Sequence, residues 1–168
     1  MDEEYKKQLD EANNIIEGQK ETIKVLSDTS NIKQPEVLGS IRYGELYGIL
    51  NPITDKLYMS DEVFSTTSVE EAKVFSLKTK VFAQKWVAED HDCDNFSFGL
   101  LGYWSDGLKS FPLGVAFSEK HAFNIFVDND KQVWIVEPQT NEWMTIEQAK
   151  KKSAPDKLSY WPMRLILL

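Results

Sequence analysis

The sequence predicts an α+β domain that follows an N-terminal coiled-coil helix. Three observations lead to this class: a helical repeat of apolar residues near the N-terminus, helix caps before two later segments, and two-residue alternation between residues 122 and 136. The chain has 168 residues, enough for one ordinary domain with a short appendage. Aromatic residues make up 12% of the chain, so a packed core is readily supplied.

Residues 1–27 are expected to form an amphipathic helix. Alternating steps of four and three residues connect the positions of one coiled-coil seam, which are Tyr5, Leu9, Ala12, Ile16, Gln19, Ile23 and Leu26. A helix with so narrow an apolar stripe is marginal alone. We therefore expect a homo-oligomer through residues 5–26, and packing on the chain's own domain is the alternative. Residues 28–36 are predicted to be a linker, and residues 37–168 the α+β domain.

The first half of that domain carries hairpin and helix signals. Residues 46–50 and 56–59 are apolar and flank a segment with Asn and Pro, which predicts a hairpin. Ser68 follows Thr67 and precedes two glutamates, which is typical of a helix start. A second helix is expected over residues 79–89.

The second half is expected to alternate between helices and strands. Asp92 is a good N-cap, so a helix should begin at Cys93. Segments 122–127 and 132–136 flank the turn residues Asp-Asn-Asp-Lys, which predicts a second hairpin. A Thr-capped helix over 145–151 and a final strand over 161–168 complete the sheet.

Composition and charge exclude several classes of function. The net charge is −8, with 27 acidic and 19 basic residues, which disfavours binding to nucleic acid. No apolar run approaches the roughly 20 residues that span a bilayer, and the N-terminus lacks signal-peptide character. The single cysteine indicates a reducing compartment or a reactive thiol. We therefore expect a cytoplasmic protein that binds neither nucleic acid nor membrane.

Cys93 is the first candidate site residue. It lies in the acidic run Glu-Asp-His-Asp-Cys-Asp of residues 89–94. The thiolate is the nucleophilic form of cysteine, and a helix N-terminus or a nearby imidazolium favours it. The flanking Asp90, Asp92 and Asp94 oppose it, because negative charge disfavours a thiolate. These acids either bind a hard cation such as calcium or are solvated residues of a helix start.

His121 and Glu137 are the second and third candidates. If the hairpin turn centres on Asn129, the two residues lie opposite each other on one face. A carboxylate in that position fixes the tautomer of an imidazole, as in a catalytic triad. The alternative is a capping histidine and a surface glutamate. Asn124 and Gln139 are neighbours that either support the site by hydrogen bonds or complete buried polar pairs.

Three ordered motifs resemble a known family. They are Asp-Cys-Asp-Asn-Phe at 92–96, His-Ala-Phe-Asn at 121–124 and Val-Trp-Ile-Val-Glu-Pro-Gln-Thr at 133–140. Together they resemble the papain-like cysteine protease domain of the Marasmius oreades agglutinin and its bacterial and phage relatives. The resemblance covers about residues 80–145, and the lectin part of that family has no counterpart in it.

The resemblance implies a papain-like α+β fold, with the cysteine-bearing helix packed on an antiparallel sheet. It also implies Cys93 as nucleophile, His121 as general base and Glu137 as the acid that orients the histidine. The family's calcium dependence implies a metal near Asp90, Asp92 and Asp94, although the mechanism itself requires no cofactor.

The expected function is therefore a cysteine hydrolase that cleaves peptide or isopeptide bonds through an acyl-enzyme, with a protein or peptide substrate. Two alternatives remain open. One is a non-catalytic oligomeric binding or structural protein, such as a phage accessory, that retains the fold. The other is an acyl transferase of the transglutaminase type.

The coiled-coil prediction is tested by removing residues 1–30. We expect the shortened chain to sediment as a monomer, because the seam that joins the copies has been deleted. Analytical ultracentrifugation of both chains at equal concentration gives the comparison. An oligomeric state that does not change on truncation would contradict the coiled coil.

Overall fold

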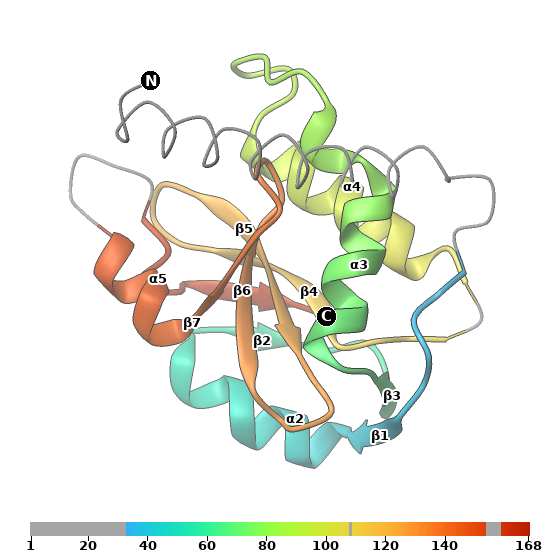
Figure 1. The fold of residues 1–168 in the computed structure, drawn as a ribbon. Coiled ribbons are helices and arrows are strands. Elements are labelled where there is room, and N and C mark those ends of the chain that lie inside the picture. Colours follow the sequence, from blue (N-terminus) through green and yellow to red (C-terminus); the bar gives the residue numbers. More distant parts are fainter. Residues whose placement is uncertain (1–32, 108, 154–158) are drawn as a thin grey trace, which may run out of the picture. The chain divides into compact units, whose positions relative to one another are not determined.

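The computed structural model describes residues 33–107, 109–153 and 159–168. Over these residues the chain is a mixed α+β domain with one sheet of two strands and one of six (Figure 1). The helix predicted for residues 1–27 and most of the predicted linker lie outside the described residues. The helices are α2 (Tyr43–Leu50), α3 (Val69–Thr79), α4 (Cys93–Ser105) and α5 (Ile146–Lys152), with short 3-10 helices η2 (Asn51–Ile53) and η3 (Val81–Ala83). The strands are β1 (Gly39–Arg42), β2 (Leu57–Tyr58), β3 (Val63–Thr66), β4 (Leu113–Phe117), β5 (Ala122–Val127), β6 (Val133–Glu137), β7 (Glu142–Thr145) and β8 (Leu165–Leu167).

The larger sheet has the strand order β2-β8-β4-β5-β6-β7. All neighbouring strands are antiparallel except β2 and β8, which are parallel. Every residue of β5 is buried, because both faces of this strand are covered. On one face Phe126 packs against Trp104 of α4. On the other face Phe123 and Ile125 join the main apolar core, which Leu46 and Leu50 of α2 also enter.

The β5–β6 hairpin forms where it was predicted, with a different register. Ile125 pairs with Ile135, which places Glu137 opposite Phe123 and not opposite His121. The loop spans residues 128–132 because Asp128 Oδ1 accepts the main-chain N–H groups of Asp130 and Gln132, each at 2.9 Å. The observed strand pairing is shifted by two residues from the predicted one. An even shift leaves every side chain on its predicted face of the sheet.

Three helix starts agree with the sequence. Ser68 caps α3 by accepting the N–H of Glu71 at 3.2 Å. Asp92 is the N-cap of α4, so Cys93 is its first residue. Thr145 and Gln148 form a reciprocal capping box at the start of α5. The final strand is shorter than predicted, since β8 covers only Leu165–Leu167.

Two other predictions are wrong. Residues 46–50 belong to helix α2 and not to a hairpin, because Leu46 and Leu50 are four residues apart and both enter the core. The helix expected over residues 79–89 does not form. Lys80 ends α3 with a left-handed backbone (φ 58°), and only the short η3 follows. Within the described residues, no helix has the length and apolar character needed to cross a membrane.

The surroundings of Gly114 and Gly48 predict opposite effects when each glycine is replaced by alanine. A Cβ at Gly114 would meet the carbonyl oxygen of Leu167 on the neighbouring strand, whereas a Cβ at Gly48 in α2 meets nothing within 4 Å. We expect Gly114→Ala to destabilise the fold by about 1–3 kcal/mol. We expect Gly48→Ala to stabilise it by about 0.5–1 kcal/mol through helix propensity. Denaturant unfolding measures both variants, and a Gly114→Ala protein as stable as the wild type would contradict the tight β4–β8 contact.

Candidate functional site

Cys93 is the first residue of α4 and is half-buried. The main-chain N–H of Asp92 donates to Asn95 Oδ1 at 3.1 Å, which closes the first turn of the helix. Ser97 Oγ donates to the Cys93 carbonyl at 2.7 Å. The cysteine therefore sits on a well-formed helix start, as the Asp-Cys-Asp pattern predicted.

Asn124 fixes α4 against the sheet. Its Nδ2 donates to the Ser97 carbonyl of α4 at 3.0 Å and to the Gly114 carbonyl of β4 at 3.1 Å. The side chain is fully buried and lies on the α4 face of β5, not on the face of the histidine. Of the two roles considered for Asn124, the structure supports the buried polar contact that holds the helix bearing Cys93.

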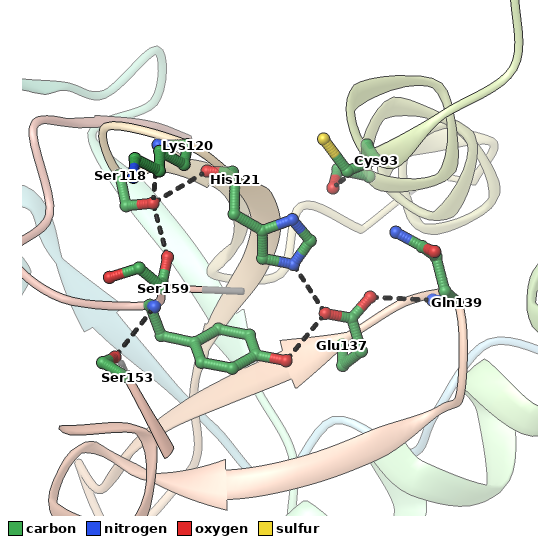
Figure 2. Close-up of polar contacts among 10 residues, drawn as sticks. Cys93, Ser118, Lys120, His121, Glu137, Gln139, Ser153 and Ser159 are labelled. Carbon is green, nitrogen blue, oxygen red and sulfur yellow. Dashed lines mark hydrogen bonds and ion pairs between the residues drawn. The ribbon is translucent and has the colours of Figure 1, made fainter. Parts of the chain in front are cut away.

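His121 and Glu137 form the predicted pair. Both are buried, and His121 Nε2 lies 2.6 Å from Glu137 Oε2 (Figure 2). They meet although they are not directly opposite each other, because diagonal neighbours on one sheet face remain within reach of long side chains. The main-chain N–H of Gln139 donates to Glu137 Oε1 at 3.1 Å. Gln139 therefore supports the pair through its backbone.

Tyr160 completes this cluster, and sequence reasoning missed it. Its hydroxyl donates to Glu137 Oε2 at 2.9 Å, and its ring packs edge-on against His121 with centroids 5.3 Å apart. The main-chain N–H of Tyr160 donates to Ser153 Oγ at 3.0 Å, which ties the residue to the end of α5. Burial, followed by the charge of Glu137, raises the pKa of Tyr160 well above its usual range. No repeat or cap in the sequence marks this position.

The second ring nitrogen of His121, Nδ1, differs from Nε2 in its surroundings. Nδ1 is buried and makes no hydrogen bond with any described residue. In Figure 2 the thiol of Cys93 lies on the Nδ1 side of the ring, and the side chain of Gln139 lies nearby. The structure thus brings Cys93, His121 and Glu137 to one site. The hydrogen bond between nucleophile and base that marks an activated thiol is not formed.

Asp90, Asp92 and Asp94, beside Cys93, were predicted to bind a metal ion. A hydrogen bond with Asp94, together with its charge and partial desolvation, raises the pKa of Asp92 above the usual range. Among the described residues, no group of three or more His, Cys, Asp or Glu side chains is arranged to hold a metal ion. Calcium binding by Asp90, Asp92 and Asp94 stays a prediction from the sequence.

Comparisons with known proteins give a fold relationship. No family model and no curated protein matches the chain. Among solved structures, the chain is similar to PSL1a in complex with E64, with a TM-score of 0.60, 19% identity and coverage of 77% of this chain and 51% of that one. It is also similar to the Polyporus squamosus lectin bound to the glycan epitope Neu5Acα2-6Galβ1-4GlcNAc, with a TM-score of 0.60, 20% identity and coverage of 77% and 49%. The chain spans about half the length of each.

These comparisons contradict the predicted cysteine hydrolase and its peptide substrate. Two structures that share the fold are PSL1a in complex with E64 and the Polyporus squamosus lectin bound to a sialylated glycan. The similarity itself establishes the α+β fold over 77% of the chain.

The raised pKa of Tyr160 predicts how stability depends on pH. Because the folded state favours the protonated phenol, its contribution is complete below the unfolded pKa of about 10 and is lost as the pH rises beyond it. The wild type should therefore lose stability above pH ~10 relative to Tyr160→Phe, which cannot ionise there. Urea unfolding at pH ~8 and ~11 measures the difference. Tyr58→Phe is the matched control, since Tyr58 is 63% exposed. Parallel losses in wild type and Tyr160→Phe would contradict the prediction.

Proposed function

We propose that this chain is a binding protein without turnover, and that its ligand lies beside His121 Nδ1, on the side that faces Cys93. The observation that carries the proposal is the buried nitrogen without a partner. Leaving a buried polar atom unsatisfied costs about 1–3 kcal/mol. A ligand atom bonded to Nδ1 would remove this cost.

The surrounding residues suit such a site. His121 is held from behind by Glu137, so the ring presents its free edge in a fixed orientation. Cys93 and the side chain of Gln139 border the same position (Figure 2). The two fold neighbours are described in complexes with E64 and with a sialylated glycan, and the chain spans about half the length of each.

Several finer features belong to this proposal. A papain-like topology is consistent with a cysteine at the start of α4 and a His–Glu pair on antiparallel strands. Assembly through residues 5–26 would make the binding protein multivalent. Cytoplasmic location and calcium dependence remain predictions from the sequence.

The proposal is tested by NMR with the two ligands described for the fold neighbours. The chain has two histidines, so their ring signals are readily assigned. We expect E64 or the trisaccharide Neu5Acα2-6Galβ1-4GlcNAc to shift the ring signals of His121 and not those of His91. His121→Gln should weaken binding about tenfold, which corresponds to about 1.4 kcal/mol.

The matched control is His91→Gln, because the His91 ring bonds to the Gln84 side chain, at 2.9 Å, outside the Glu137 cluster. Cys93→Ser provides a second site variant should His121→Gln unfold. Failure of both ligands to shift His121 would refute the binding site. Continuous release of product from a peptide library, abolished by Cys93→Ala, would refute binding without turnover.

A further inference from the structure

We infer that a second ligand site lies at the C-terminal end of α4 and takes a small amine that carries an apolar group. A cavity of about 430 Å³ lies there, lined by the last turns of α4, by β3 with the residues before it, and by the stretch that leads into β4. The helix runs from Cys93 to Ser105, so its two ends are about 18 Å apart. The cavity is thus separate from the proposed ligand position beside His121.

The inner wall of the cavity is apolar. Phe64, Trp104 and Phe111 line it, and each of them is at most 5% exposed. Trp104 Nε1 donates to Ser76 Oγ at 3.3 Å, so the indole needs no polar partner from a ligand. Cavities of about 300–1,000 Å³ with aromatic walls and a few polar groups are typical of sites for small molecules. This wall suits the apolar group of such a ligand.

Asp61 is the polar group that selects the ligand. It lines the cavity and is half-buried, and its Oδ2 accepts a hydrogen bond from Ser110 Oγ at 2.6 Å. Among the described residues, Oδ1 has no hydrogen-bond or ion-pair partner. The main-chain N–H of Ser60 donates to the Leu168 carbonyl at 2.9 Å, which ties the adjoining backbone to the end of β8. The carboxylate is therefore oriented before a ligand arrives.

The charges around the cavity favour a cation. The carbonyl groups at the C-terminal end of a helix carry a partial negative charge, and Asp106 is the C-cap residue of α4. Lys109, the basic residue of the lining, is exposed and forms no ion pair with a described residue, so solvent screens its charge. An ammonium group can donate to Asp61 Oδ1, whereas a carboxylate would be repelled by it.

Three probes with the same phenyl ring test the choice of an amine. They are phenethylamine, phenethyl alcohol and hydrocinnamate, which are cationic, neutral and anionic at neutral pH. The full chain labelled with ¹⁵N is titrated with each, and the amide signals of Ser105 and Ser110 report binding. We expect phenethylamine to bind about tenfold more tightly than phenethyl alcohol, as one hydrogen bond to a charged group supplies. Hydrocinnamate should bind most weakly.

Three variants test the site itself. Asp61→Asn keeps an oxygen acceptor for Ser110 and removes the charge, so it should weaken binding of phenethylamine about tenfold and leave phenethyl alcohol unchanged. Glu70→Gln is the matched control, because Glu70 is exposed and does not line the cavity. Ser105→Trp replaces an exposed residue of the lining with a bulky one. It should block the cavity and weaken binding of all three probes.

The outcomes that would overturn the inference are distinct. Equal affinity for the amine and the alcohol, or equal losses in Asp61→Asn and Glu70→Gln, would refute an amine ligand. No shift at Ser105 and Ser110, or binding that persists in Ser105→Trp, would refute the cavity as its site. His121→Gln should leave phenethylamine binding unchanged, so this site is tested independently of the proposed function.

Discussion

The carboxylate of Glu137 is the constraint on which the described domain depends. Removing one partner from a buried ionic pair typically costs about 3–5 kcal/mol, so a buried carboxylate needs all its donors in place. They come from three separate parts of the chain: His121 before β5, the Gln139 backbone after β6, and Tyr160 near the C-terminus. The cluster therefore requires the hairpin and the C-terminal segment to be in their native positions together.

The face of the β5–β6 hairpin was predicted correctly from the sequence, whereas its register was not. The face of the sheet on which a side chain lies depends only on whether the strand pairing shifts by an odd or an even number of residues. The observed register differs from the predicted one by two, so His121 and Glu137 still share a face and form their bond. The register is decided by the loop conformation, which Asp128 sets by hydrogen bonds and in which Lys131 has a left-handed backbone (φ 64°). These local hydrogen bonds cannot be recognised from the hydrophobic pattern of the sequence.

The misread elements share a physical cause. Residues 43–50 are apolar at most positions, and a short apolar run does not distinguish a buried helix from a strand. Leu46 and Leu50 lie four residues apart on one helix face, but this spacing identifies a helix only when the core against which they pack is known. Tyr160 was missed for a related reason: it reaches Glu137 across 23 residues of chain, and no local signal reports such a contact. Helix caps such as Ser68 and Thr145 were found because each acts within its own first turn.

A His–carboxylate pair beside a helix-borne cysteine is a geometry that binding and catalysis share. The sequence reveals the residue types and their order, and these are the same in both cases. In a catalytic pair the imidazole nitrogen that faces the thiol comes within hydrogen-bond reach of it, whereas His121 Nδ1 is buried and makes no hydrogen bond with any described residue. Glu137 and Tyr160 hold the imidazole ring of His121 in a fixed position. The imidazole of His121 thus connects the buried carboxylate of Glu137 to the side of the site on which Cys93 lies.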